Sequence, residues 1–333
     1  MRTKLAALLT LALLITVGVV YAASASTTGQ ASSAARATGS CKHPYKTCAP
    51  SSTPSTTATS PTPSSSSSTA PPTRHKVMII IEENHSRAEA TAQMPHLAAW
   101  ASQYGQATNY TAVTHPSLPN YLAIGGGDTF GVTDDNPPSA HPISSASVFG
   151  QTVAAGLTAK TYAETMPSNC DVTSSGNYAV KHNEWAYFNS PTERSACNEN
   201  DVPMGTTGSG NLLSDINAGR LPVTGQMTPN LCNDAHDCSL STADNWLNGW
   251  IPKLMAGPDY TAGNLTIVIT FDEDDRSASN NVPFVVIDPR LHAKSVTLAA
   301  NHYSLTRWLD DNAGTAPLNK AATASNLKAA FGL

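Results

Sequence analysis

The amino-acid sequence predicts a three-layer α/β/α sandwich with a mostly parallel central sheet. Two nearly continuous apolar runs, KVMIIIE at 76–82 and LTIVITF at 265–271, are typical of strands that are covered on both faces. Segments with helical spacing lie between them and alternate with shorter apolar runs. This alternation favours helices packed on both sides of one sheet.

The other helices and strands are predicted from the spacing of apolar residues and from glycines that end helices. The segment 94–104 has helical spacing and ends before Gly105, and the segment 147–155 ends before Gly156 in the same way. The interval 165–210 is rich in Asn, Ser, Gly and Thr, and we expect it to be an excursion held by a disulfide. The expected elements, in chain order, are a strand at 76–82, a helix at 94–104, a strand at 107–113, a helix that opens near Pro119, a helix at 147–155, a strand at 159–163, helices at 211–218 and 242–255, strands at 265–271, 282–287 and 295–300, and a helix at 304–309.

The sequence divides into three regions. Arg2 and Lys4 precede an apolar run at 5–20 and small residues at 23–25, which is typical of a signal peptide over residues 1–25. Residues 49–72 are almost wholly Ser, Thr, Pro and Ala, so we expect a disordered Ser/Thr/Pro-rich linker over 26–73. Residues 74–333 suffice for one large catalytic α/β domain. We expect a secreted, extracellular monomer with no integral membrane segment.

Charge is distributed unevenly along the chain. Of the 19 Lys and Arg residues, seven lie in residues 1–76, which contain no acid, so the rest of the chain carries 12 basic against 24 acidic side chains, a formal charge of −12. This balance argues against nucleic acid as a partner, since nucleic-acid binding needs a basic surface. It is compatible with a site that collects cations.

The six cysteines form close pairs in the sequence: Cys41/Cys48, Cys170/Cys197 and Cys232/Cys238. An even number of cysteines in an exported chain favours disulfides over a metal cluster. Pairing by proximity is one of fifteen connectivities, and we take it as the expectation.

The segment Thr114-His115-Pro116-Ser117-Leu118-Pro119-Asn120-Tyr121 places one hydroxyl between two prolines. Proline fixes φ and restricts the residue before it, so Ser117 is held rigidly just before a predicted helix. A rigid serine suits a nucleophile, and an ordinary Pro-rich turn is the alternative. The segment lacks the Gly-x-Ser-x-Gly frame of an α/β-hydrolase.

Acidic clusters follow two predicted strands. Glu82-Glu83-Asn84-His85 comes after the first strand, and Asp272-Glu273-Asp274-Asp275 comes after the strand at 265–271. Sites in open α/β sheets gather beyond the carboxyl ends of strands. Two solvated loops are the alternative to a shared cation. Carboxylate and amide oxygens suit Ca²⁺, Mg²⁺ or Mn²⁺, with Zn or Fe as further candidates.

Further polar groups complete the candidate site. Asp234 and His236 lie in a short Cys-bounded loop and could bind a metal or act as acid and base. His302 follows the predicted strand at 295–300, and Lys181-His182 lies in the excursion. The run Gly125-Gly126-Gly127-Asp128 lacks the ending of a phosphate loop and follows a helix, so we reject that interpretation.

These motifs together resemble the bacterial phosphoesterase family of acid phosphatases and phospholipases C, which has the alkaline phosphatase-like fold. The resemblance runs from about residue 75 to 315. The matching motifs are EENHS (82–86), THPSLPNYLA (114–123), GDTFGVTDD (127–135), YAE (162–164), NYAVKHNEW (177–185), PNLCNDAHD (229–237), DNWLN (244–248), ITFDEDD (269–275) and HYSL (302–305).

The resemblance implies a role for each candidate residue. Ser117 matches the nucleophile, and Asn120 matches an amide that holds a phosphate oxygen. The matching metal ligands are Glu83, Asn84, Ser117, Asp272 and Glu273. Asp234, His236 and His302 match the half of the site where two-metal relatives hold a second cation, and Lys181 and His182 match substrate contacts.

One departure from the family pattern concerns the second cation. Two-metal relatives space the Asp and His four apart, whereas Asp234 and His236 are two apart. This spacing disfavours a second cation, and Asp234 is the candidate ligand if a second site exists. The alternative role for His236 and His302 is to contact phosphate and protonate the leaving group.

The resemblance implies an exported, metal-dependent phosphomonoesterase of the acid phosphatase type that works through a phosphoserine. Phosphatidylinositol 3-phosphate is a candidate substrate. A phospholipase C that cleaves phosphodiester head groups is the nearest alternative. A non-catalytic envelope protein that binds phosphate or lipid is the third.

Overall fold

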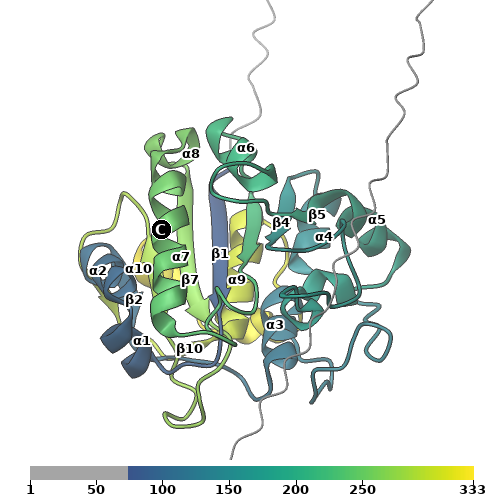
Figure 1. The fold of residues 1–333 in the computed structure, drawn as a ribbon, viewed down its shortest axis with the longest axis horizontal. Coiled ribbons are helices and arrows are strands. Elements are labelled where there is room, and N and C mark those ends of the chain that lie inside the picture. The colour runs from purple at the N-terminus through teal and green to yellow at the C-terminus, as the bar shows by residue number, and fades with distance from the viewer. Residues whose placement is uncertain (1–73) are drawn as a thin grey trace, which may run out of the picture. The chain divides into compact units, whose positions relative to one another are not determined.

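The computed structural model describes residues 74–333, and the signal peptide, the linker and the Cys41/Cys48 pair lie outside the described residues. Its main sheet has eight strands, with β1 and β7 side by side near the centre (Figure 1). The strands, in spatial order, are β5 (Asp201–Pro203), β4 (Ala159–Ala163), β6 (Thr224–Thr228), β1 (Lys76–Glu82), β7 (Leu265–Phe271), β8 (Phe284–Ile287), β2 (Gly105–Ala107) and β9 (Lys294–Val296).

The main sheet is mostly parallel, as predicted. Only β8 runs antiparallel to its neighbours β7 and β2 among the described strand pairs. The strands β1, β7 and β8 are buried along most or all of their length, because helices cover both faces of the sheet. The short strands β3 (Tyr110–Thr111) and β10 (Ala300–Asn301) pair with each other in a separate two-stranded sheet.

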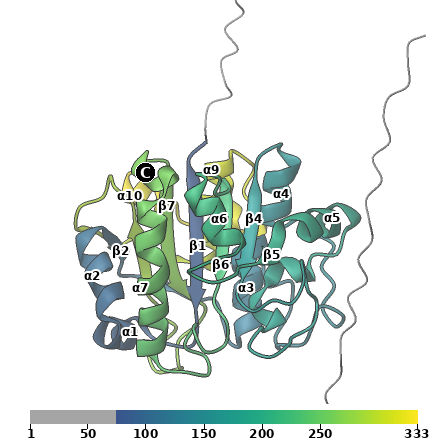
Figure 2. The same ribbon diagram turned by 45° about the horizontal axis from the view of Figure 1, so that its top comes forward.

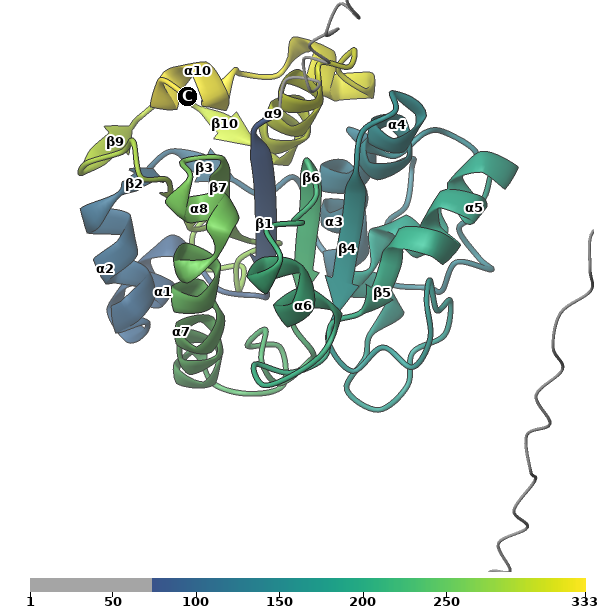
Figure 3. The ribbon, with the colours of Figure 1, turned by 90° about the horizontal axis from the view of Figure 1, so that it is seen from above.

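Helices cover both faces, which confirms the three-layer sandwich (Figure 3). One layer contains α1 (Arg87–Gln93), α2 (Pro95–Gln103), α6 (Asn211–Asn217), α7 (Leu240–Ala256) and α8 (Pro258–Thr261). The other contains α3 (Ser117–Gly126), α4 (Val148–Ala154), α5 (Pro191–Asn200), α9 (His302–Ala313) and α10 (Leu327–Phe331). Three short 3₁₀ helices complete the fold: η1 (Val180–His182), η2 (Glu184–Tyr187) and η3 (Asn319–Thr323).

Most predicted elements are confirmed, and two predicted strands are wrong as single strands. The segment 107–113 divides into β2 and β3, because the chain leaves the main sheet after Ala107 and then pairs with β10. The segment 295–300 divides into β9 and β10 for the same reason. The final helix is longer than predicted, since its capping box begins at Asn301 rather than near Ser304.

One central strand, β6, was not predicted. Its sequence TGQMT has neither an apolar run nor alternation, yet it is buried between β4 and β1. The glycine has a packing reason: a Cβ on Gly225 would lie 2.7 Å from the Met78 side chain and 2.9 Å from Pro222. The side chains of neighbours thus fill the space that a larger residue would need.

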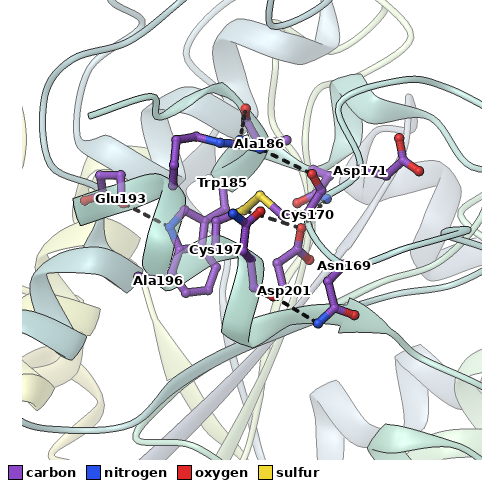
Figure 4. The surroundings of a disulfide bond; sticks show 12 residues. Asn169, Cys170, Asp171, Trp185, Ala186, Glu193, Ala196, Cys197 and Asp201 are labelled. Carbon is purple, nitrogen blue, oxygen red and sulfur yellow. Dashed lines mark hydrogen bonds between the residues drawn. A yellow bond between two sulfur atoms is a disulfide. The ribbon is translucent and has the colours of Figure 1, made fainter. Parts of the chain in front are cut away.

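The excursion at 165–210 contains more regular structure than predicted, namely η1, η2, α5 and β5. The predicted disulfides Cys170–Cys197 and Cys232–Cys238 are both present. Around the first disulfide, Trp185 Nε1 donates to Glu193 and Asn183 donates to Asp201 (Figure 4). The excursion is therefore fixed by buried polar contacts as well as by the covalent bond.

Within residues 74–333, no helix combines the length and the apolar character that a membrane span requires.

Candidate active site

The site begins where β1 and β7 end together. The two strands are parallel, and Glu82 pairs with Phe271. The Asp272 amide continues this ladder by donating to the Glu82 carbonyl at 2.9 Å. The next residues, Glu83 and Asp272, are therefore brought to the same edge of the sheet, where α3 also begins (Figures 1 and 2).

Ser117 is the first residue of α3, and its side chain is buried against Glu83. Its hydroxyl donates to Glu83 Oε2 at 3.0 Å. Lys181 Nζ lies 3.5 Å from the same hydroxyl oxygen. Pro116 precedes the helix in extended geometry, as its fixed φ allows. The predicted nucleophile thus lies between a carboxylate and an ammonium group at a helix N-terminus.

Asn120 holds the loop before α3 in place. Its Oδ1 accepts from the backbone N–H groups of Val113 and Thr114 at 3.0 and 3.1 Å, and its Nδ2 donates to the Thr114 carbonyl at 2.9 Å. The Nδ2 also lies 3.2 Å from Glu273 Oε2. The amide is fully buried and fully used within the protein, so its contact with phosphate stays a prediction.

The acidic residues after β1 and β7 form one connected group. Asp272 Oδ1 accepts from the backbone N–H groups of Asn84 at 3.0 Å and of Glu273 at 2.6 Å. The Asn84 side chain donates to Glu83 Oε2 at 3.1 Å. Asn84 has a φ of 61°, a left-handed conformation that Asn tolerates better than most residues. Hydrogen bonds thus link the predicted metal ligands Glu83, Asn84, Asp272 and Ser117 into one group, and Glu273 joins it through its backbone N–H.

His182 lies between two carboxylates. Its Nε2 is 3.0 Å from Glu83 Oε1 and its Nδ1 is 3.1 Å from Asp234 Oδ2, while its ring stacks on Tyr121 at 5.1 Å. Burial would lower the pKa of His182, but Glu83 and Asp234 raise it to about 9. Burial would raise the pKa of Glu83, but the His182 charge lowers it to about 2. The two groups therefore form a buried ion pair.

One imidazole serves two of the buried carboxylates of this group. Glu83 Oε1 and Asp234 Oδ2 are paired only with the nitrogens of His182, and Asp272 Oδ2 is buried without a hydrogen-bond partner among the described residues. Burial and the charges of Glu83 and Glu273 raise the pKa of Asp272 well above its usual range. Buried carboxylates with so few cationic partners fit a hard divalent cation.

Nitrogen ligands are available at the same place. Single ligand atoms of Glu83, His182 and His236 lie within 4.8 Å of one another. Imidazole and carboxylate together suit Zn²⁺ and other transition metals as well. The donor set fits a divalent metal and is compatible with each of the candidate metals.

Lys181 and His236 form the more open side of the site. Lys181 Nζ lies 3.2 Å from His236 Nε2 and 3.2 Å from Asp135 Oδ2. Burial would lower the pKa of Lys181, but Glu83 and Asp135 raise it above its usual value. His236 is fixed by its Nδ1, which lies 2.7 Å from Asp237 Oδ1. A cationic group therefore stands beside the Ser117 hydroxyl.

His302 is committed to structural contacts. Its Nε2 lies 2.6 Å from the Asp272 carbonyl and its Nδ1 lies 2.9 Å from the Tyr110 hydroxyl. Burial lowers the pKa of His302 to about 4, so the ring is neutral near pH 7. These contacts support the loop that carries Asp272, and the contact of His302 with phosphate stays a prediction.

Sequence reasoning did not assign two residues of the site. His115 lies 3.1 Å from Glu273 Oε2 and 3.3 Å from Asp274 Oδ1. Asp135 accepts from the Leu118 backbone N–H at 3.0 Å and pairs with Lys181, so it joins the start of α3 to the ammonium group. Both residues lie inside the motifs THPSLPNYLA and GDTFGVTDD, but only the tertiary structure shows their partners.

The chain matches the Phosphoesterase family over residues 90–312. The phosphatidylinositol-3-phosphatase of Mycobacterium tuberculosis is 32% identical over 260 residues, which cover 77% of this chain and 81% of that protein. The phosphate-repressible acid phosphatase of Penicillium chrysogenum is 32% identical over 235 residues, 66% of this chain and 54% of that protein. The chain thus spans about half the length of this fungal relative.

Solved structures agree on the fold. A protein of the alkaline phosphatase superfamily from Vibrio parahaemolyticus aligns with a TM-score of 0.50 at 11% identity, over 73% of this chain and 67% of that one. A lipoteichoic acid synthase from Listeria monocytogenes aligns with a TM-score of 0.52 at 10% identity, over 75% and 76%. These likenesses confirm the alkaline phosphatase-like fold. On its motifs and its relatives, the chain belongs to the phosphoesterase family of phosphoric ester hydrolases.

Proposed function

We propose that the protein is a secreted, metal-dependent phosphomonoesterase of the acid phosphatase type. The observation that carries the proposal is the Ser117 hydroxyl, 3.0 Å from Glu83 Oε2 and 3.5 Å from Lys181 Nζ at the start of α3. A helix N-terminus and a nearby ammonium group both favour the negative charge of a phosphate. Secretion rests on the predicted signal peptide and is supported by the two disulfides.

Glu83, Asn84, Asp272 and Glu273 would hold the cation together with the Ser117 oxygen, and His182 offers a nitrogen ligand. When bound, a divalent cation lowers the pKa of a hydroxyl ligand and offsets negative charge on phosphate. The identity of the metal is a separate question, since the donor set suits several cations. The large negative charge of the folded region is a further reason to expect cation dependence.

The reaction would proceed in two transfers. Ser117 Oγ passes its proton to Glu83 Oε2, which already accepts from the hydroxyl, and attacks phosphorus, while the bond to the ester oxygen breaks and the leaving oxygen gains a proton. Lys181 stabilises the charge on the transferred group. His236 lies beside Lys181 on the open side and is the candidate donor of that proton. Water then attacks the phosphoserine, releases inorganic phosphate and restores the Ser117 hydroxyl.

The substrate class is a phosphate monoester, and phosphatidylinositol 3-phosphate is a candidate because the mycobacterial relative is named for it. A phospholipase C would instead release a phosphorylated head group from a diester. Identification of the product distinguishes the two activities.

The direct test is Ser117→Ala, assayed for phosphate release from phenyl phosphate with each candidate cation. Loss of the nucleophile should lower kcat by on the order of a thousandfold or more. The variant should keep cation-dependent thermal stabilisation, since the other ligands remain. Ser147→Ala is a matched control, because Ser147 is a buried serine that caps α4 and bonds to Glu193 and Gly150 rather than to a residue of the site. Retention of most activity by Ser117→Ala would refute the assignment.

A further inference from the structure

A cavity of about 650 Å³ opens beside the nucleophile. Three charged residues lie among its lining: Lys181, His236 and Asp135. Lys181 is the link to the reaction centre, since its Nζ is 3.5 Å from Ser117 Oγ. The volume falls within the range of about 300–1,000 Å³ that is typical of pockets for small molecules. The cavity therefore adjoins the site on the side of Lys181 and His236.

The rest of this cavity carries no charged side chain. Its walls include Val172, Tyr178, Val180 and Leu231, and its other polar side chains are the hydroxyls of Ser139, Thr173 and Ser174. The Tyr178 hydroxyl is already committed, since it donates to the Asp171 carbonyl at 2.7 Å and accepts from Asn183 at 2.9 Å. Val172 is 43% exposed, which is unusual here, because only it and Leu298 are exposed large hydrophobic residues in the described chain. An exposed apolar side chain at a cavity wall favours contact with an apolar ligand.

The walls are held in place before any ligand binds. Val172 follows Cys170, which is bonded to Cys197 at the start of the excursion (Figure 4). Ser175 and Tyr178 exchange two backbone hydrogen bonds of 3.0 Å across the turn that contains Gly176. The Leu231 backbone N–H donates to the Asn177 carbonyl at 3.0 Å and joins this turn to the loop before Asp234. A preformed wall binds a ligand without an ordering cost.

We propose that this cavity is the leaving-group subsite and that it selects phosphate monoesters of uncharged, apolar alcohols. The inference rests on the proposed function, since it places the phosphate between Ser117 and Lys181. The alkyl or aryl group of the ester then extends along Val172, Tyr178 and Leu231. An ester whose alcohol carries further charges would leave those charges without partners at these walls. Phosphatidylinositol 3-phosphate is such an ester, because its leaving alcohol carries a phosphodiester, so this subsite disfavours it among the candidate substrates.

A series of n-alkyl phosphates tests the proposal on the metal-loaded enzyme. Ethyl, butyl, hexyl and octyl phosphates share nearly the same leaving-group chemistry and differ in apolar area. We expect kcat/KM to rise with chain length by up to about fourfold for each methylene that becomes buried, until the cavity is filled. All esters are used below the concentration at which they form micelles.

Two variants locate the effect. Val172→Asp places a carboxylate at the cavity wall, and we expect it to flatten the dependence of kcat/KM on chain length. Leu298→Asp is the matched control, because Leu298 is 42% exposed and does not line the cavity. It should keep the dependence of the unmodified enzyme.

The outcomes separate this inference from the proposed function. Hydrolysis of all four esters at equal kcat/KM would overturn the subsite and leave the phosphatase intact. A dependence that survives Val172→Asp, or that Leu298→Asp also removes, would place the apolar contact elsewhere and overturn the assignment of this cavity. Failure to hydrolyse any monoester with any candidate cation would count against the proposed function itself.

Discussion

Glu83 connects the parts of the active site at the scale of single residues. One carboxylate accepts from the Ser117 hydroxyl and the Asn84 amide and pairs with His182. Asp272 stands beside it at the end of the neighbouring strand, with one oxygen buried and unpartnered. Carboxylates that are crowded in this way repel one another unless a cation lies between them. If this arrangement binds a cation, as we propose, it must weaken the metal-free fold.

Metal binding should thus appear in stability as well as in activity. We expect chelation to abolish activity and to lower the thermal unfolding midpoint, and the productive cation at about 100 times its Kd should add about 2.7 kcal/mol to the free energy of unfolding. Asp272→Asn keeps an acceptor for the Asn84 and Glu273 N–H groups and removes one charge. It should be more stable than the metal-free unmodified enzyme and should lose most of the response to metal.

The control for this metal prediction is Asp310→Asn, which removes a buried carboxyl away from the site. It should keep the full metal response. An unmodified enzyme whose unfolding midpoint is the same with Mg²⁺, Ca²⁺, Mn²⁺ or Zn²⁺ as with chelator would contradict the account.

Asn120 and His302 show why residue roles are harder to predict than residue positions. The sequence motifs placed both near the site, and both are there. Their polar atoms, however, bond to backbone groups of the Ser117 loop and to the Asp272 carbonyl. An amide or imidazole makes the same hydrogen bonds with protein and with phosphate, so the residue type alone does not distinguish a supporting role from substrate contact.

At the scale of elements, the glycines at the end of α3 allow this helix to pack closely against the excursion at 165–210. A Cβ on Gly125 would lie 2.4 Å from Glu184 Cγ, and a Cβ on Gly126 would lie 2.8 Å from ring atoms of Phe130 and Phe188. Gly127 ends the helix with a φ of 70°. The glycine run that superficially resembles a phosphate loop is therefore a close packing surface behind Ser117, as its position after a helix indicated.

A pair of alanine substitutions tests this packing role. Gly126→Ala should lower the free energy of unfolding by about 1–3 kcal/mol, because the rings of the buried Phe188 and the half-buried Phe130 must move. Gly249→Ala in α7 is the matched control, since the nearest atom to its Cβ would be Thr207 Cγ2 at 3.5 Å. There the gain in helix propensity should raise stability by up to about 1 kcal/mol. Urea unfolding measures both. A stabilising Gly126→Ala would show that the rings are not tightly packed.

At the scale of the whole molecule, the sheet collects the site from distant parts of the chain. Long apolar strands and glycine-stopped helices made the layers and most element positions predictable, because burial on both faces leaves a strong pattern. β6 left no such pattern, since its neighbours supply the side chains over Gly225. Without β6, the sequence could not show that the loop carrying Asp234 begins at the same sheet edge as Glu83 and Asp272. Contacts such as that between Asp135 and Lys181 form only in the folded chain, because the two residues are distant in the sequence.

Global stability should also depend on Asp310, which lies in α9 away from the active site. Burial raises the pKa of this carboxyl to about 7, although Gln151 and the Leu318 N–H donate to it. Between about pH 4 and pH 7 the folded protein keeps a proton that the unfolded chain has lost. Stability therefore falls as the pH rises through this window, by at most about 1.4 kcal/mol per pH unit for one proton.

Urea unfolding of metal-free protein, with and without Asp310→Asn, measures this effect. The free energy of unfolding of the variant minus that of the unmodified protein should grow as the pH rises from about 4 to 7 and should level off above 7. A difference that is constant over this range would show that Asp310 does not titrate between the folded and unfolded states.

The central claim is that Ser117 carries the phosphoryl group during turnover. The most direct measurement is acid quenching of the metal-loaded enzyme with saturating phenyl phosphate, followed by mass spectrometry of the peptide that contains Ser117. The account predicts one phosphoryl group on Ser117 that disappears when substrate is exhausted. A phosphoryl group on a histidine or on another serine would contradict it, as would an unlabelled enzyme that inverts the configuration at phosphorus.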